Sequence, residues 1–313
     1  MEVRTSLDAA GNPPCSLALG TFDGLHRGHM AVIRAALDGP WEPQVFTFSQ
    51  SPSGERAVIT RRDKRKLLEQ AGVKRMFSAD FSQLRDMEAE VFVRDVLLDK
   101  LNARRLCCGE DFRFGRGALG DVKLLERLCG ERGTELLVAP PVMDGGEKVS
   151  STRIRQAVAE GDMPLAERLL GRPFGFSLEV IHGNHIGTGL GTPTINQALP
   201  EDFALPKFGV YAAWCRVDGA YYYGVCNIGV KPTVGSDRVL AETWMPGFSG
   251  DLYGRRVRLF LLNFIRPERK FASLEELKAE ITRNARTAKR LAQARGPRSQ
   301  GAWPCQAPAP GRV

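Results

Sequence analysis

The segment that constrains this chain most is residues 17–30, which read LALGTFDGLHRGHM. It opens on a short apolar run typical of a buried strand end, and Gly20 and Gly24 then supply tight, low-bulk backbone. A helical pattern of apolar residues begins near His29 and continues to Leu37. A strand, a glycine-containing turn and a helix in this order bring free helix N–H groups and the helix dipole to a place where they can bind a phosphate.

Two histidines stand at the start of this helix. His26 and His29 are three residues apart, so both can face one side of the helix and donate hydrogen bonds to phosphate oxygens. The pattern therefore favours a nucleoside triphosphate site. Two other interpretations stay open at this point: the histidines are packing or surface residues, or they ligate a metal, although no third ligand stands nearby in the sequence.

These residues belong to a longer motif, Gly20-x-Phe22-Asp23-Gly24-x-His26-x-Gly28-His29. Its last four positions resemble the HxGH signature of the nucleotidylyltransferase superfamily, and its full form resembles the bifunctional bacterial riboflavin kinase/FAD synthetase family. The resemblance implies that His26 and His29 are catalytic. It also implies that the ATP phosphates are bound by Gly20, Phe22, Asp23, Gly24 and Gly28.

The first half of the chain alternates strand-like and helix-like segments. Strands are expected at residues 17–19, 45–48, 73–77, 106–109 and 136–139, and helices at 61–71, 88–101 and 124–131. The helix at 88–101 would bury Val91, Phe92, Val96 and Leu97. Such alternation predicts a parallel, Rossmann-like α/β sheet whose ligands bind at the carboxyl ends of the strands. The turn within residues 17–30 and the loop after Cys108 both follow the carboxyl end of a predicted strand. Residues 1–14 are expected to be a polar leader.

The loop at residues 109–115 reads GEDFRFG. It places acids, a base and two aromatic rings between glycines, and the ring faces could stack on a flat ligand ring. From composition alone, an ordinary glycine-bounded loop is the simpler explanation. The segment closely resembles the GxDFxFG segment that lines the adenylyltransferase site of the family, which implies a flavin-binding role for Asp111, Phe112 and Phe114.

Residues 150–155 read SSTRIR and open a helix. Hydroxyls at a helix start cap it, and the same hydroxyls, the free N–H groups and Arg155 can bind triphosphate oxygens, so both roles can hold together. The string resembles the SSTxxR motif of the family. The resemblance implies that Ser151 and Thr152 bind phosphate and that Arg155 is catalytic.

A domain boundary is expected near residue 172. The helix that opens at residue 150 should end at Gly161, and a second helix, capped by Asp162, should end at Gly171. The Arg-Pro-Phe-Gly sequence at residues 172–175 follows, so a nucleotidylyltransferase-like domain is predicted over residues 1–172.

The second half of the chain has short β-rich runs in place of helical periods. They lie at residues 178–182, 209–217, 221–227, 239–244 and 257–264, and most are separated by turns with Gly, Pro or Asp. This spacing predicts a small antiparallel β-barrel over residues 175–292, with one terminal helix. Ser273 and Glu276 form a capping box for that helix. Its apolar stripe would consist of Leu274, Leu277 and Ile281.

A glycine-rich segment, residues 183–196 (GNHIGTGLGTPTIN), lies between the first two runs of this half. Its glycines allow a phosphate to approach the backbone, and Thr194 and Asn196 offer the neutral oxygens that Mg²⁺ prefers. It is not a Walker A loop, because it lacks Gly-Lys-Ser/Thr. By composition alone, a flexible turn is the simpler explanation.

The Gly-x-Pro-Thr-x-Asn string in this segment resembles the PTAN motif of riboflavin kinases. Further stretches resemble the same domain in the same order: Asn227-Ile228-Gly229 with Pro232-Thr233, Glu242-Thr243, GDLYG at 250–254, and Arg266-x-Glu268-x-Lys270-Phe271. The resemblance implies that Glu242, otherwise an ordinary solvated acid, takes the proton of the attacking hydroxyl. It also implies ATP binding by Gly187, Gly191 and Pro193, flavin binding by Asn227, and Mg²⁺ binding by Thr194 and Asn196.

The resemblance covers about residues 15–290 and implies a bifunctional enzyme. It would phosphorylate riboflavin to FMN and adenylylate FMN to FAD, with riboflavin, FMN, ATP and Mg²⁺ as its small molecules. The sequence departs from the family pattern at Thr188, where Arg is usual, at Thr192, where an aromatic residue is usual, and over residues 49–52 and 244–249. These departures leave an alternative open: one activity alone, or flavin or nucleotide binding without turnover.

Composition bounds the partners and the compartment. The net charge is +8, but seven basic and no acidic residues lie in 283–313, which leaves +1 for residues 1–282. Only this charge suggests a nucleic-acid-binding module, so nucleic-acid binding is not expected. The tail from residue 293 should be disordered. The short, mixed N-terminus is not expected to be a signal peptide. The sequence has no apolar run near twenty residues and no C-x-x-C among its seven cysteines, so a cytoplasmic protein without a membrane partner is expected. Weak self-association stays open.

Overall fold

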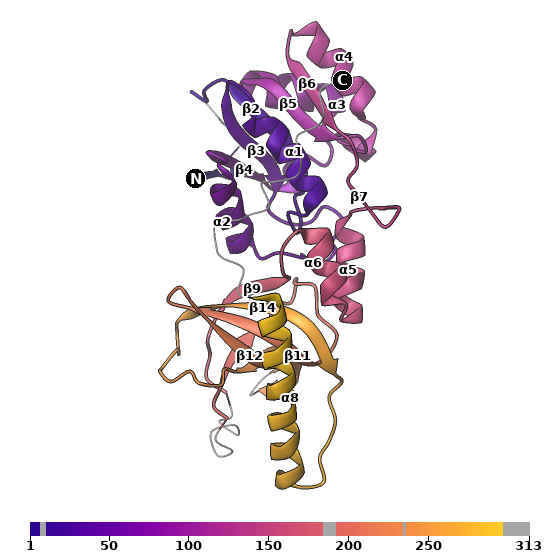
Figure 1. The fold of residues 1–313 in the computed structure, drawn as a ribbon. Coiled ribbons are helices and arrows are strands. Elements are labelled where there is room, and N and C mark those ends of the chain that lie inside the picture. Colours follow the sequence, from indigo (N-terminus) through magenta and orange to yellow (C-terminus); the bar gives the residue numbers. More distant parts are fainter. Residues whose placement is uncertain (7–10, 184–191, 234–235, 297–313) are drawn as a thin grey trace. The chain divides into compact units, whose positions relative to one another are not determined.

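The computed structural model describes residues 1–6, 11–183, 192–233 and 236–296 (Figure 1). The chain divides into two compact units, Met1–Ser151 and Thr152–Val313. This division falls earlier than the boundary expected near residue 172, because helices α5 (Ser151–Glu160) and α6 (Met163–Leu170) group with the second unit. Within the described residues, no helix is long and apolar enough to span a membrane.

The first unit is built, over its described residues, on a six-stranded parallel sheet in the order β1-β4-β3-β2-β5-β6. The strands are β1 (Glu2–Arg4), β2 (Cys15–Leu19), β3 (Glu42–Phe48), β4 (Arg75–Ala79), β5 (Ala103–Gly109) and β6 (Glu135–Ala139). The expected Rossmann-like arrangement is confirmed. The expectation of a polar leader is wrong for residues 2–4, which pair with β4. A strand of only three residues is too short to show the alternation of apolar and polar residues by which strands are recognised in a sequence.

Helices connect these strands and cover the sheet. The longer ones are α1 (Arg27–Leu37), α2 (Arg61–Ala71), the π-helix η2 (Phe92–Lys100) and α4 (Val122–Glu131). Shorter elements are η1 (Phe81–Gln83), α3 (Ala89–Val91), η3 (Arg116–Ala118) and the hairpin of β7 (Met143–Asp144) and β8 (Glu147–Lys148). Helix α2 has the expected bounds because the Thr60 side chain caps its first turn and left-handed Gly72 ends it.

The helix expected at residues 88–101 is mostly a π-helix. The Leu101 N–H donates to the Val96 carbonyl at 2.9 Å, five residues back. Phe92, Val96 and Leu97 are buried as expected, but Val91 is 42% exposed, which corrects that part of the predicted face. The spacing of apolar residues does not distinguish an α-helix from a π-helix, because both kinds of helix place these residues on one side.

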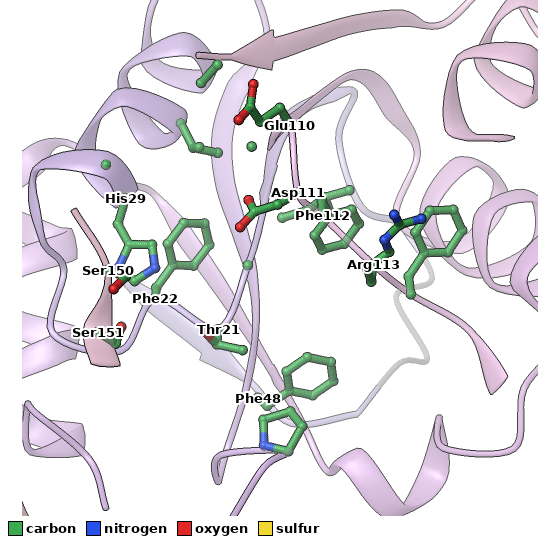
Figure 2. A pocket seen from close by; sticks show the side chains of 18 of the residues that line it. Thr21, Phe22, His29, Phe48, Glu110, Asp111, Phe112, Arg113, Ser150 and Ser151 are labelled. Carbon is green, nitrogen blue, oxygen red and sulfur yellow. The ribbon is translucent and has the colours of Figure 1, made fainter. Parts of the chain in front are cut away.

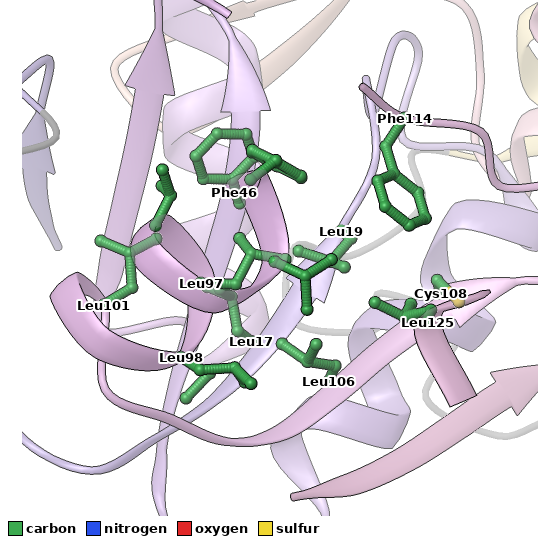
Figure 3. Packing of buried hydrophobic residues seen from close by; sticks show 14 of the residues in the cluster. Leu17, Leu19, Phe46, Leu97, Leu98, Leu101, Leu106, Cys108, Phe114 and Leu125 are labelled. Carbon is green, nitrogen blue, oxygen red and sulfur yellow. The ribbon is translucent and has the colours of Figure 1, made fainter. Parts of the chain in front are cut away.

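The core of the first unit lies between η2, α4 and the sheet. Figure 3 shows Leu17 and Leu19 of β2 and Phe46 of β3 near Leu97 of η2. All five residues of β2 are buried, as a central parallel strand requires when helices cover both faces. The cysteines in the described residues are free and buried, as expected for reduced thiols.

The second unit carries, over its described residues, a six-stranded antiparallel sheet in the order β10-β13-β12-β11-β14-β9. The strands are β9 (Gly175–Glu179), β10 (Thr194–Ala198), β11 (Gly209–Val217), β12 (Ala220–Thr233), β13 (Ser236–Trp244) and β14 (Arg256–Arg266). The Gln197 side chain on edge strand β10 donates to the Leu178 carbonyl on the other edge strand at 2.7 Å and to the Val257 carbonyl at 2.9 Å. The edges therefore meet, which confirms the expected small barrel.

Two expectations about this unit need correction. The first strand lies at 175–179 rather than 178–182, and residues 194–196, assigned to the glycine-rich segment, belong to strand β10. Thr and Asn beside Pro and Gly suggest a turn, and pairing with β13 overrides that local preference. Helix α5 ends as expected, at Glu160 before left-handed Gly161. Helix α6 also ends as expected, because Asp162 caps its start and left-handed Gly171 ends it.

The terminal helix α8 (Leu274–Arg295) begins as expected, with the Ser273 hydroxyl accepting from the Glu276 N–H at 3.2 Å. The predicted apolar stripe is wrong at Leu274, which is 63% exposed, whereas Leu277 and Ile281 are half-buried. The buried face runs instead through Glu280, Asn284, Ala288 and Ala292. Small residues let the helix lie close to Ala212 and Leu262 of the sheet, so its contact face is not its most apolar face. Residues 293–295, expected in the disordered tail, are helical.

Candidate functional site

A cavity of about 690 Å³ lies at the carboxyl ends of the strands in the first unit. Its lining includes residues 20–22 after β2, 48 and 52 around the end of β3, 81, 84 and 85 after β4, 109–115 after β5, and 139–142 after β6. The strand order reverses between β2 and β5, since the chain first adds β3 and β4 on one side and later β5 and β6 on the other. This is the place where open parallel sheets bind ligands, as the sequence predicted.

The turn after β2 delivers the two histidines. Phe22 and Leu25 have φ of 48° and 46°, and Gly24 has φ of 79°, so the chain reverses within a few residues. The His26 Nδ1 accepts the His29 N–H at 3.2 Å and thereby caps α1. The two rings stack with their centroids 3.5 Å apart. Because Nδ1 of His26 accepts, the proton of its neutral ring stands on Nε2, which can donate.

Gly28 makes room for this stack. A Cβ at residue 28 would lie 3.2 Å from Cε1 and Nδ1 of the His26 ring. Gly20 has a similar task, since its Cβ would lie 3.1 Å from the Phe22 ring. Gly20 and Gly28 therefore act here by leaving room for neighbouring rings, whereas Gly24 acts through its left-handed backbone in the turn. The Phe22 ring in turn meets His29 edge-on, with centroids 5.4 Å apart.

Asp23 supports the turn from outside the cavity. Its Oδ1 accepts the Val58 N–H at 2.8 Å, and its carbonyl accepts the Ser151 hydroxyl at 2.9 Å. Gly20, Phe22, His26, Gly28, His29 and Ser151 line the cavity, while Asp23 and Gly24 do not appear in its lining. The structure therefore gives Asp23 a supporting place, although the sequence pattern grouped it with the phosphate-binding residues.

Aromatic rings form much of the remaining wall. Figure 2 shows His29, Ser150 and Ser151 at one side of the pocket and Phe112 and Arg113 at the other. Phe112 stacks on Phe114, with centroids 5.5 Å apart; Phe114 is buried and Phe112 is half-buried. The sequence analysis missed other rings of the lining, which are Phe46, Phe48, Phe81 and Phe92. The signal that could have found two of them is their position in the chain, because Phe48 ends strand β3 and Phe81 lies two residues after the end of β4.

A charged pair stands at the same pocket. The Lys148 ammonium lies 2.7 Å from the Asp111 carboxylate, and both residues line the cavity. Lys148 belongs to β8, whose hairpin is also joined to α1 by the 3.1 Å ion pair of Arg27 with Asp144. The expected flavin-binding Asp111 thus has a cationic neighbour that the sequence analysis did not identify. Both side chains of the pair are exposed enough to exchange this contact for a ligand.

The other residues expected at this site belong to the second unit. Thr152 and Arg155 lie on α5, and the Arg155 guanidinium is 3.5 Å from the Thr152 hydroxyl. Their roles stay predictions.

The second unit has its own row of polar residues across three strands. Asn196 on β10 pairs with Glu242 on β13, and Glu242 pairs with Asn227 on β12. Residues directly opposite in a sheet point to one face, so the three side chains share a face, and Thr194 joins them two residues along β10. The Asn227 amide also donates to the Glu268 carboxylate at 2.9 Å. The sequence identified these residues as separate motifs, and the strand register brings them together.

This row has oxygen ligands suited to Mg²⁺. Among the described residues, the buried Asn196 Oδ1 has no hydrogen-bond partner, and a buried polar atom of this kind calls for a ligand or water. The Glu242 carboxylate stands opposite it, and Mg²⁺ prefers carboxylate and carbonyl oxygens. The donor set therefore fits the metal. Pro193 is described and exposed, whereas Gly187, Thr188 and Gly191 lie outside the described residues.

Comparison with known proteins decides the family. A family model described as FAD synthetase matches residues 8–153, and one described as riboflavin kinase matches residues 170–292. A curated relative from Escherichia coli K12, named bifunctional riboflavin kinase/FMN adenylyltransferase, is 35% identical over 297 residues, which cover 91% of this chain and 95% of the relative. The chain belongs to this family. A relative of the same name from Pseudomonas fluorescens is 38% identical over 89% of this chain and 93% of its own length.

A solved structure agrees at the level of fold. A Streptococcus pneumoniae structure titled macrolide-efflux protein matches with a TM-score of 0.83 and 27% identity, over 92% of this chain and 99% of that one. By the two family models, this chain has a FAD synthetase domain followed by a riboflavin kinase domain.

Proposed function

We propose that the chain makes FMN from riboflavin with its C-terminal barrel and makes FAD from FMN with its N-terminal sheet unit. The observation that carries this proposal is the presence of two separate sites in the two domains. The N-terminal unit has a stacked histidine pair beside an aromatic-walled cavity, and the barrel has a carboxylate between two amides. Domain boundaries near residues 172–175, with a barrel to residue 292, are part of the proposal.

In the N-terminal unit, a phosphate oxygen of FMN would attack the α-phosphorus of ATP, and pyrophosphate would leave. This displacement needs no covalent enzyme intermediate, so the protein has to position the two phosphates and stabilise charge. His26 and His29 would donate to oxygens of the reacting phosphate, which their stacking at the helix start supports. Ser151, Thr152 and Arg155 would bind the triphosphate, as the SSTxxR resemblance implies.

The flavin ring would bind against the aromatic wall of the same cavity. Phe112 offers a ring face at the pocket, while buried Phe114 holds Phe112 from behind. Asp111 would bind a polar edge of the flavin, and Lys148 beside it would limit the negative charge there. These roles give Phe112 the direct contact and Phe114 a supporting one.

In the barrel, Glu242 would take the proton of the riboflavin hydroxyl that attacks the γ-phosphate. Thr194 and Asn196 would hold Mg²⁺, which when bound neutralises charge on the phosphates. Gly187, Gly191 and Pro193 would contact ATP, and Asn227 would contact the flavin. The Thr188 departure removes one charge-assisted hydrogen bond, worth about 1.5–3 kcal/mol.

A second candidate function follows from the departures. Without the Arg and the aromatic residue usual at positions 188 and 192, the barrel could bind flavin or nucleotide without turnover, and the chain would keep only FAD synthesis. This candidate predicts FAD from supplied FMN but no FMN from riboflavin.

The test is to incubate the protein with riboflavin, ATP and Mg²⁺ and to separate the flavins by chromatography. FMN followed by FAD supports both activities, and loss of both on chelation of Mg²⁺ supports the metal. FMN without FAD contradicts the N-terminal assignment. Failure with riboflavin and with supplied FMN contradicts the whole proposal. A cytoplasmic location, where thiols stay reduced, is also proposed, and the free buried cysteines support it.

A further inference from the structure

Lys64 on α2 is a partly buried cation that none of these steps uses. Its ammonium donates to the Thr21 carbonyl at 2.6 Å and to the Thr47 hydroxyl at 2.7 Å, and that hydroxyl donates to the same carbonyl at 2.8 Å. Burial lowers the pKa of Lys64 to about 8, although the charge of Asp23 opposes the shift. Desolvating an ammonium costs free energy, so its retention here points to a specific task.

The carbonyl that Lys64 binds begins the turn that leads to the histidines. Thr21 lines the cavity, and the next residue, Phe22, has φ of 48°. Leu25, just before His26, has φ of 46°. Residues with side chains enter this left-handed region at a cost and remain there only where the surroundings hold them. Fixing the Thr21 carbonyl fixes the first peptide of this strained turn.

We infer that Lys64 is a positioning residue for adenylyl transfer, which holds the Thr21 carbonyl so that the turn presents the His26–His29 pair to the cavity. The inference rests on the proposed function of the N-terminal unit. An ammonium suits the task because its three donors can bind the carbonyl and the Thr47 hydroxyl together. Lys64 does not line the cavity and contacts it only through Thr21, so we expect its effect to pass through the turn to the histidines.

The test uses Lys64→Met, which removes the donors, Lys64→Arg, which keeps charge and donors, and Lys66→Met, a matched control at an exposed position of the same helix. We expect Lys64→Met to lower kcat for FMN adenylylation on the order of 10- to 100-fold, because small displacements of catalytic groups have effects of this size. KM for ATP and FMN should stay near the wild-type values. Lys64→Arg should recover most of the rate, and Lys66→Met should match wild type.

Riboflavin phosphorylation by the same chain is the internal reference, and it should be unchanged in every variant. Full adenylylation by Lys64→Met, or a raised KM at unchanged kcat, overturns the inference. Thr47→Val breaks the second contact to the carbonyl while keeping the side-chain shape. It should lower kcat in the same direction, so the inference stays testable if Lys64→Met does not fold.

A spectroscopic readout does not depend on activity. Ring-proton NMR of the histidines should show that Lys64→Met shifts the signals of the stacked pair and leaves those of His182, in the other unit, in place. Unmoved signals of the pair overturn the inference. If the wild-type protein makes no FAD, the proposed function fails, and this readout still tests Lys64.

Discussion

The two sites of this chain are built in different ways. In the N-terminal unit, the cavity residues follow the ends of five parallel strands, and turns with unusual backbone angles aim them. In the C-terminal unit, Asn196, Glu242 and Asn227 lie inside neighbouring strands, and the register of the sheet aligns them. The first site depends on local turns and caps, whereas the second depends on pairing between segments far apart in the sequence.

The difference determines how each site can be damaged. A change in one strand-end turn alters one wall of the cavity and leaves the sheet intact. A shift of one residue in β13 would turn Glu242 to the other face of the barrel and would break the whole row. Substitutions that act on one site and spare the other therefore test this comparison.

The largest effect is expected from Glu242→Gln. Removing the base should lower riboflavin phosphorylation by about 100- to 10,000-fold, the usual range for general-base catalysis. FMN supplied directly should still become FAD at the wild-type rate. Both rates are measured by chromatography of the flavins. Continued phosphorylation would remove Glu242 as the base.

His29→Ala should give the opposite pattern. Loss of a preorganised donor to the reacting phosphate should lower FAD formation by about 100- to 1,000-fold. FMN formation from riboflavin should not change, because His29 belongs to the other domain. Equal loss of the two activities would contradict the division of labour.

Gly28→Ala tests the turn-built character of the first site. The added methyl group would meet the His26 ring at 3.2 Å, so we expect FAD formation to fall by roughly 10-fold with FMN formation unchanged. The matched control is Gly130→Ala on α4, where a Cβ would meet nothing within 4 Å. That variant should keep both activities. A Gly28→Ala enzyme with full FAD formation would show that the ring stack is not required.

The smallest effect is expected from alkaline pH, which should lower the stability of the two units alike. Burial raises the pKa of Cys15 and Cys107 in the first unit and of Cys226 in the second to about 12, from a usual 9.0. Between pH 9 and 12 these thiols hold fewer protons in the unfolded chain than in the folded one, so their contribution to the free energy of unfolding should fall as pH rises through this window. Lys64 in the first unit, whose pKa is lowered to about 8 on folding, opposes this fall up to its usual pKa of 10.5, but the more numerous thiols should outweigh it. Both units should lose stability, as measured by denaturant unfolding under reducing conditions. A rise in stability of either unit would contradict the assignment of these thiols.

The sequence predicted best where local chemistry decides the structure. Helix α2 was found at its expected residues because Thr60 and Gly72 mark its ends, and β11 at its expected residues because its apolar run lies between turns. Edge strand β1 was missed because it has three residues, and β10 because its composition suggests a turn.

The candidate sites show the same limit. The histidine motif was visible as a string, since its spacing follows from one turn and one helix start. The row of Asn196, Glu242 and Asn227 was visible only as separate motifs, because no spacing in the sequence gives the register of three strands. The support by Lys64 and the charge of Lys148 were missed, because both act across contacts between distant segments.

The π-helix η2 has a consequence for how the cavity can vary. Phe92 opens this helix and lines the cavity, while Leu97 further along it lies in the core. A π-turn holds one residue more than an α-turn, so deleting one residue between Phe92 and Leu97 would let an α-turn replace the π-turn with both residues still in place. The same deletion in an α-helix would rotate everything beyond it by about 100°. This wall of the cavity can therefore lose one residue from η2 and keep both Phe92 at the cavity and Leu97 in the core.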